Sequence, residues 1–230
     1  AVTSEDAKIR LERMGISPQY IYNIGAPGLV GIKQDAEYRL SDAKKYFPCS
    51  EIGVKVVCVF HPVVQEIQSI SDQMRLVIEL LLKKKCRGIL LLPNSDAGGK
   101  RIEEVIDDYK SELNENGLII FKHMDRKLYL SCIKTCDLVI GNSSSGIIES
   151  ASLNVPALNI GSRQRNRLRN NNVVDCPSIS RTALSSSFDQ ALALDRTKPF
   201  ENKYGDGNTD KHLIQIILLN LDMYLVTKLL

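Results

Sequence analysis

Short apolar runs alternate with segments of helical periodicity along most of the chain. The runs resemble strands covered on both faces, and they occupy residues 54–60, 89–92, 118–121, 138–140, 157–160 and 173–174. The periodic segments predict helices at residues 64–85, 101–113, 126–135, 146–152 and 183–194. This alternation predicts consecutive strand–helix units, and therefore an α/β fold with a doubly wound, Rossmann-like parallel sheet.

The two ends of the chain carry different patterns. Residues 4–15 predict an amphipathic helix and Tyr20–Asn23 a short strand, whereas the glycines and proline of residues 23–28 indicate an irregular connector at a domain boundary. Residues 210–230 are long enough to cross a bilayer. Because charged residues interrupt this segment, it predicts a helix buried on most of its faces and no membrane partner.

Composition narrows the class of protein. A chain of 230 residues with 43% apolar and 25% charged residues is typical of a soluble globular protein, and its net charge of +3 is too small to indicate nucleic acid. We expect a cytoplasmic protein, since the chain enters a charged helix without a signal peptide and its six cysteines follow no disulfide framework. Cys132 and Cys136 lack a second pair at zinc spacing, so no metal site is predicted.

Polar and glycine-containing segments follow five of the predicted strands. They lie at residues 61–62, 93–98, 122–124, 141–146 and 161–164. The carboxyl ends of parallel strands share one edge of a sheet, which is where open α/β sheets bind ligands. The sequence therefore predicts one ligand site, built from these segments.

The segment Cys136–Glu149 runs from a predicted strand through a serine turn into a helix. Free backbone N–H groups at the helix start, with the hydroxyls of Ser143 and Ser144, would suit a phosphate. Glu149 lies one turn further on, and beside a phosphate it should turn sideways and accept hydrogen bonds from neutral hydroxyls such as a ribose diol. An ordinary serine N-cap followed by a solvent-facing glutamate is an equally good interpretation of these residues.

Three further strand-end residues are candidates for the same ligand. Pro62 disfavours helical geometry at His61, so the imidazole should point into the crevice and bind phosphate. Asn94 could hydrogen-bond a nucleobase or ribose, or form an Asx turn. Arg163 is the member of an alternating arginine series nearest to a strand end, and it could reach a diphosphate. The series lacks the interleaved aromatics of a nucleic-acid site.

Two common nucleotide signatures are absent. Residues 98–101 resemble the end of a phosphate-binding loop, but Asn94 and Arg101 stand where that loop needs Gly and Ser or Thr. The sequence also lacks the GxGxxG pattern of dinucleotide-binding domains. Neither a P-loop nucleotidase nor an NAD enzyme is supported, and no cofactor is predicted.

Five segments in order resemble the hydrolysing UDP-N-acetylglucosamine 2-epimerases. They are FHPV (60–63), PNSDAG (93–98), GNSSSGIIE (141–149), NIGSRQ (159–164) and YGDGNT (204–209). The resemblance covers nearly the whole chain but only the second half of the family's protein, which has the two-domain GT-B architecture. It implies that residues 1–32 are a remnant of the first domain plus the interdomain linker, and that residues 33–230 are the nucleotide-sugar-binding Rossmann-like domain with a C-terminal crossing helix.

The resemblance also implies roles for individual residues. The UDP contacts it implies are His61, Asn94, Ser143, Ser144, Glu149 and Arg163, with the backbone near Met124 reading uracil. The chain lacks the Arg-rich segment after the histidine and the Gly-Gly pair of the non-hydrolysing epimerases. It departs from the family at Asn166, where a glycine is usual, so the course of that loop is open.

In the family, elimination of UDP gives a glycal, and hydration then releases N-acetylmannosamine for sialic-acid-type sugar synthesis. The carboxylates for proton transfer lie in the first domain, so this chain alone is expected to bind UDP without turnover. No catalytic residue is assigned here, although His61 is the first suspect for a base.

Two alternatives stay open: a non-catalytic nucleotide-sugar-binding module and, less favoured, a GT-B glycosyltransferase fragment. The substituent at C4 of the sugar is not predicted. Apolar residues of the last helix, Leu213, Ile216, Ile217, Leu221 and Leu225, would favour self-association if exposed.

Overall fold

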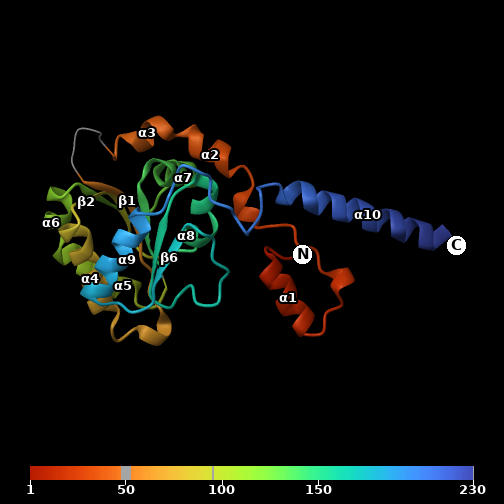
Figure 1. Cartoon of the computed structure of the whole chain (residues 1–230), viewed down its shortest axis with the longest axis horizontal. Coiled ribbons are helices and arrows are strands. Elements are labelled where there is room, and N and C mark those ends of the chain that lie inside the picture. The colour runs from red at the N-terminus through yellow and green to blue at the C-terminus, as the bar shows by residue number, and fades with distance from the viewer. Residues whose placement is uncertain (48–52, 95, 230) are drawn as a thin grey trace. The chain divides into compact units, whose positions relative to one another are not determined.

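The computed structural model describes residues 1–47, 53–94 and 96–229, and the chain divides into two compact units. The larger unit is Lys33–Glu201, and the smaller one combines Ala1–Ile32 with Asn202–Leu230. Figure 1 shows the strands and most of the helices of the larger unit. The candidate ligand residues all belong to the larger unit.

Six parallel strands form the sheet of the larger unit, in the order β3-β2-β1-β4-β5-β6. The strands are β1 (Val54–Val59), β2 (Cys86–Leu91), β3 (Leu118–Phe121), β4 (Leu138–Gly141), β5 (Ala157–Ile160) and β6 (Val173–Cys176). The order reverses between β1 and β4, which is the topological switch point of doubly wound sheets. The predicted parallel Rossmann-like sheet is confirmed.

Helices cover both faces of this sheet (Figure 1). On one face, α4 (Ile70–Lys83), α5 (Gly99–Asp108) and α9 (Arg181–Leu192) share a buried core with alternate strand residues such as Val56 and Cys58. The other helices of this unit include α7 (Arg126–Thr135), which packs on β1 and α3. Coverage of both faces explains why the strands are almost continuously apolar.

Several helix boundaries differ from those predicted. The segment 64–85 begins with a 3₁₀ turn, η3 (Val64–Glu66), before α4, and the segment 101–113 divides at Tyr109 into α5 and α6 (Lys110–Glu115). Tyr109 has φ −100° and ψ 7°, outside the α region, so the helix cannot continue through it. The segment 146–152 is one turn, α8 (Ser145–Ile148), followed by the 3₁₀ turn η4 (Ser150–Leu153).

Two helices of the larger unit were not predicted. They are α2 (Ile32–Tyr38) and α3 (Leu40–Lys44), each too short to show a clear periodicity. Five cysteines, Cys58, Cys86, Cys132, Cys136 and Cys176, are buried free thiols, and Cys49 lies outside the described residues. Burial raises the pKa of the Cys58 thiol to about 12. Within the described ranges, no cluster of His, Cys, Asp or Glu could hold a metal ion.

The smaller unit joins the two ends of the chain. Its helix α1 (Glu5–Arg13) precedes the 3₁₀ turns η1 (Pro18–Tyr20) and η2 (Pro27–Leu29). The predicted strand at Tyr20–Asn23 is wrong, because Pro18 starts a 3₁₀ turn there and only Asn23 pairs, as a single bridge to Val2.

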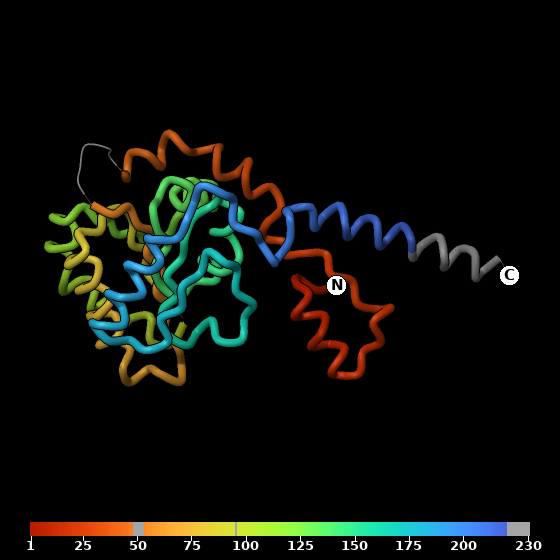
Figure 2. Tube along the Cα trace, viewed as in Figure 1, coloured from red at the N-terminus to blue at the C-terminus, as the bar shows by residue number. Residues whose placement is uncertain are grey.

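The connector after that bridge holds the start of the last helix. The Ala26 N–H donates to the Tyr204 carbonyl at 2.7 Å, and the Thr209 hydroxyl donates to the Ala26 carbonyl at 3.1 Å. Gly25 has φ +83°, and a Cβ there would lie 3.0 Å from the Tyr204 oxygen. The chain can be followed through both segments in Figure 2.

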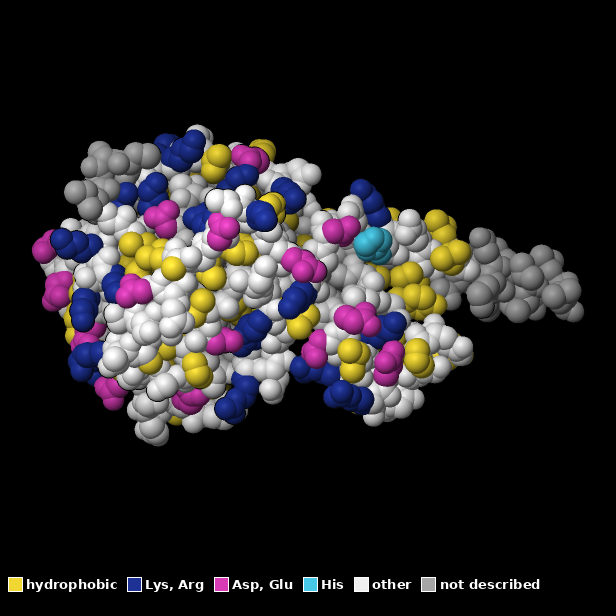
Figure 3. Space-filling model, in the orientation of Figure 1, with side chains coloured by type: hydrophobic (Ala, Val, Ile, Leu, Met, Phe, Trp, Pro, Cys, Tyr) yellow, Lys and Arg dark blue, Asp and Glu magenta, His cyan; other side chains and the backbone are white. Residues whose placement is uncertain are grey.

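The last helix, α10 (Thr209–Leu229), is more exposed than predicted. Leu213 and Ile217 are 41% and 49% exposed, and Figure 3 shows hydrophobic side chains along its described part. Thr209 and His212 in the first turn bond to residues 24 and 26, whereas Leu213 and Ile217 lie beyond those bonds. The side chains of Leu221 and Leu225 lie outside the described residues. No helix in the described ranges is long and apolar enough to span a membrane.

Candidate functional site

A cavity of about 600 Å³ lies at the carboxyl edge of the sheet, where β1 to β4 end. Its lining includes six of the seven predicted binding residues: His61, Asn94, Met124, Ser143, Ser144 and Glu149. These residues follow four different strands, so parallel pairing and short loops bring them together. The first turn of α7 adds Asp125, Arg126 and Tyr129 to the lining.

The serine turn after β4 contributes both backbone and hydroxyl donors. Ser143 and Ser144 are partly buried, and their N–H groups bond to no other described residue. The helix that follows is a single turn, so the dipole argument made from the sequence applies to one turn only. An anion at this segment would therefore depend on local N–H and hydroxyl groups.

Asn142 holds the strand ends in place, and the sequence analysis did not identify it as a site residue. Its side-chain oxygen accepts from the His61 N–H at 2.7 Å, and its side-chain N–H donates to the His61 carbonyl at 2.8 Å. Its own carbonyl accepts from Arg163 at 3.2 Å and from Gln164 at 2.8 Å. The side-chain amide and backbone carbonyl of one buried residue thus tie the ends of β1, β4 and β5 to each other.

His61 has a defined orientation at the cavity wall. Its Nδ1 accepts from the Asn94 N–H at 3.4 Å, so the neutral ring carries its proton on Nε2. Burial, together with the positive charge of Arg163, lowers the pKa of His61. A neutral imidazole at this wall can therefore donate one hydrogen bond from Nε2.

Arg163 is the predicted residue that does not line the cavity. It is partly buried behind the serine turn, with its guanidinium on the Asn142 carbonyl. Burial lowers the pKa of Arg163, and the nearby carboxylate of Asp96 opposes that shift. The guanidinium still contributes positive charge to this end of the site, since it acts on His61.

Glu149 lines the cavity but has a cationic partner that the sequence analysis did not consider. Its carboxylate accepts from the Arg126 guanidinium at 2.9 Å, and its side chain is only 15% exposed. The alternative of a solvent-facing glutamate is therefore wrong for this structure. The sequence could have indicated Arg126 and Tyr129 as further site residues. Both lie in the helix that follows β3, and residues three apart in a helix lie on the same face.

The loop between β5 and β6 carries the alternating arginines, and an ion pair to β6 holds it in place. Arg169 pairs with Asp175 at 2.9 Å and also donates to the carbonyls of Gln164 and Arg167. Asn166, which replaces the usual glycine, has φ +68°, a left-handed conformation that asparagine tolerates better than most residues. The loop thus keeps a glycine-like turn at Asn166.

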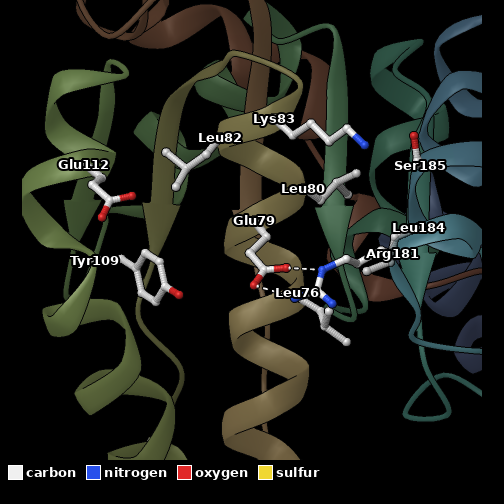
Figure 4. A pocket seen from close by; sticks show the side chains of 10 residues that line it. All are labelled: Leu76, Glu79, Leu80, Leu82, Lys83, Tyr109, Glu112, Arg181, Leu184 and Ser185. Atoms are coloured by element: carbon white, nitrogen blue, oxygen red, sulfur yellow. Dashed lines mark hydrogen bonds and ion pairs between the residues drawn. The ribbon is translucent and has the colours of Figure 1, made fainter.

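A second cavity, of about 330 Å³, lies between helices of the larger unit (Figure 4). Leucines of α4 and α9, including Leu76, Leu80 and Leu184, contribute much of its lining. Its most prominent polar feature is the ion pair of Glu79 and Arg181, whose two bonds measure 2.8 and 3.0 Å. Because these charges already neutralise each other, this cavity is poorly suited to a phosphate ligand.

Charged side chains of both signs are interspersed on the face that Figure 3 shows. This distribution agrees with the small net charge of +3. The charge on this face therefore does not indicate an anionic partner, and an anion would have to be bound by local donors such as those of the serine turn.

Fold and site together define a doubly wound α/β domain whose topological switch point carries a cavity with several polar side chains in its lining. The model of the UDP-N-acetylglucosamine 2-epimerase family matches residues 1–218, and the chain belongs to that family. The family resemblance stated from the sequence motifs is thereby confirmed.

Three similar proteins illustrate the match. A UDP-N,N'-diacetylbacillosamine 2-epimerase (hydrolyzing) of Legionella pneumophila is 38% identical over 94% of this chain and 56% of its own length. The polysialic acid biosynthesis protein P7 of Escherichia coli is 32% identical over 76% of the chain and 44% of its own length. The crystal structure of a Neisseria meningitidis UDP-GlcNAc 2-epimerase bound to UDP-GlcNAc matches with a TM-score of 0.73 at 15% identity, over 94% of this chain and 60% of that one.

The predicted fold class, the Rossmann-like C-terminal domain of a GT-B type enzyme, is confirmed. The chain spans about half the length of the curated relatives it matches. The activity of a whole protein of this kind is therefore a proposal for this chain.

Proposed function

We propose that this chain is the UDP-binding half of a hydrolysing UDP-N-acetylglucosamine 2-epimerase. The observation that carries the proposal is the convergence of six predicted contacts on one cavity at the switch point of the sheet. The names of the relatives from Legionella and Escherichia coli support a hydrolysing reaction and a place in sialic-acid-type sugar synthesis.

In the proposed complex, the serine turn binds the diphosphate. The N–H groups and hydroxyls of Ser143 and Ser144 donate to its oxygens, and neutral His61 donates from Nε2. Glu149 accepts from the ribose hydroxyls while Arg126 keeps it in place, and the backbone near Met124 contacts uracil. Asn94 contacts the nucleoside, and Arg163 adds positive charge behind the serine turn.

The proposed reaction expels UDP across C1 and C2 of the sugar and then hydrates the resulting glycal to N-acetylmannosamine. This chain supplies groups that stabilise the negative charge developing on the leaving diphosphate. Removal of the C2 proton requires a base. We assign that base to carboxylates outside residues 1–230, so the proposed contacts within this chain serve binding and leaving-group stabilisation.

Calorimetry with UDP, GDP and NAD tests the binding half of the proposal. UDP should bind to residues 1–230, and NAD should not, because its dinucleotide fingerprint is absent. Equal binding of uridine and UDP would contradict a diphosphate site at the serine turn.

A turnover assay separates the enzyme half from a non-catalytic nucleotide-sugar-binding module. Residues 1–230 alone should release no N-acetylmannosamine from UDP-N-acetylglucosamine, even at high protein concentration. Release by this chain alone would contradict the missing-base argument and make His61 the first residue to test. A longer protein that binds UDP but turns over neither acetamido nor diacetamido substrate would support the module.

The exposed apolar residues of α10 lead to one proposal about assembly. Leu213, Ile214 and Ile217 are exposed neighbours on the helix, so residues 1–230 should self-associate. The mass measured by size-exclusion chromatography with light scattering should fall on dilution. A constant monomer mass would contradict this proposal.

A further inference from the structure

Three hydroxyl groups of residues in the cavity lining form a hydrogen-bonded chain at the serine turn. The Tyr129 hydroxyl lies 2.6 Å from Ser145 Oγ, and Ser145 Oγ donates to Ser143 Oγ at 3.0 Å. Ser145 has one hydroxyl proton, and it is used in the bond to Ser143. Tyr129 must therefore be the donor to Ser145.

The same contacts determine what Ser143 can do. Its oxygen accepts from the Ser145 hydroxyl and also from the Ser145 N–H, at 3.4 Å. A hydroxyl has two acceptor lone pairs and one proton, so both acceptor positions of Ser143 are occupied. Its remaining capacity is to donate its own proton, either to the neighbouring Tyr129 oxygen or to a ligand oxygen in the cavity that Ser143 lines.

Tyr129, the first hydroxyl of this hydrogen-bonded series, stays protonated. Burial is the main cause that raises the pKa of its phenol, and the negative charge of Glu149 acts in the same direction. Ser145 is buried, so water does not compete freely for its hydroxyl. Donation along such a chain polarises each successive hydroxyl and strengthens the last donor.

We propose that Tyr129 and Ser145 act as positioning residues that make Ser143 an obligatory hydrogen-bond donor to an anionic oxygen, the diphosphate of the nucleotide ligand. This assignment rests on the proposed function and names the atom order Tyr129 Oη, Ser145 Oγ, Ser143 Oγ, ligand oxygen. Tyr129 is not required to touch the ligand. Its effect reaches the phosphate through Ser143, both by way of Ser145 and by its own interaction with Ser143.

Binding of UDP and uridine to residues 1–230 and its variants tests the assignment. Tyr129→Phe removes only the first hydroxyl, and it should weaken UDP about three- to tenfold, the range of one neutral hydrogen bond. Uridine, which lacks phosphate, should bind with unchanged affinity. Tyr109→Phe is the matched control, because Tyr109 lines the second cavity, and it should change neither ligand.

A double substitution gives a readout that a purely structural role would not produce. In a Ser143→Ala background, Tyr129→Phe should change UDP affinity by less than about twofold, because the group through which it acts is gone. Equal, independent losses in both backgrounds would overturn the hydroxyl chain. A parallel loss of uridine binding and thermal stability in Tyr129→Phe would also overturn it.

The unaltered chain distinguishes this inference from the proposed function. Absence of UDP binding by the unaltered chain would overturn the proposed function and this assignment together. UDP binding that is insensitive to Tyr129→Phe would overturn only the assignment.

Discussion

Two cavities of the larger unit, the one at the sheet edge and the one between the helices, differ in how their walls are built. The cavity at the sheet edge is lined by residues that follow four strands and by the first turn of α7, and it contains hydroxyl, imidazole and carboxylate groups. The cavity between the helices is rich in leucine, and Glu79 and Arg181 pair within it. Polar groups that keep spare hydrogen-bonding capacity occur at the edge where a doubly wound sheet exposes its strand ends.

The difference indicates that polar groups which contribute little to stability are located at the strand ends, whereas the residues between the helices stabilise the fold. A leucine between helices is buried by its neighbours, so its main contribution is to the free energy of unfolding. A serine N–H at a strand end has no partner in the described chain, and such a group is retained when a ligand supplies one. Substitutions in the two cavities should therefore separate stability from binding.

The largest expected effect lies in the helical cavity. Leu184 is fully buried, and Leu184→Ala should lower the free energy of unfolding by about 2–5 kcal/mol, as core leucine truncations do. UDP affinity of the folded protein should not change. Urea unfolding and calorimetry measure the two quantities, with Ser185→Ala in the same cavity as the control. A matching loss of UDP affinity would mean that the cavities are coupled.

The next effect lies at the sheet edge. Arg163→Ala should weaken UDP by about 1.5–3 kcal/mol if the guanidinium leaves the Asn142 carbonyl and donates to the diphosphate in the complex. Arg165→Ala is the control, since Arg165 is an exposed arginine of the same loop. Titration calorimetry measures both. If the two variants lose the same affinity, only the general charge of the loop matters.

A smaller effect is expected at Glu149. Glu149→Gln should weaken UDP by about 1 kcal/mol while leaving 2',3'-dideoxy-UDP unchanged, if the carboxylate holds the ribose diol. Glu79→Gln removes a carboxylate from the helical cavity and should affect neither ligand. Equal losses for both nucleotides would restrict Glu149 to holding Arg126.

The sequence predicted the parallel sheet and the position of the cavity at its carboxyl edge, because both depend on local patterns of apolar and polar residues. Apolar runs followed by polar turns identified where strands end, and parallel pairing then required those turns to meet. The strand-end pattern indicated residues 122–124, and the family resemblance then implied the uracil contact near Met124.

Other features could not be predicted because they arise from contacts between distant segments. Asn142 mimics a backbone partner for His61, a role that depends on how β1 and β4 align. The hydroxyl chain requires Tyr129 of α7 to reach Ser145, sixteen positions away. The short helices α2 and α3 carry too few turns to show a periodicity.

The smallest predicted effect is a pH dependence that belongs to the sheet edge alone. Burial and Arg163 lower the pKa of His61 below its ordinary value of 6.5, so the unfolded chain binds the proton more readily than the folded one. This difference in pKa contributes to the free energy of unfolding. The contribution is fully present above the unfolded-state pKa of His61 and is lost as the pH falls toward its folded-state pKa. The thermal midpoint should therefore fall as the pH decreases from 7 to 5, and His61→Gln should make that slope shallower. His123→Gln is the control, because His123 is an exposed histidine of the same cavity lining. If His123→Gln changes the slope as much as His61→Gln, or if His61→Gln leaves it unaltered, then burial of His61 at the strand end does not account for the pH dependence.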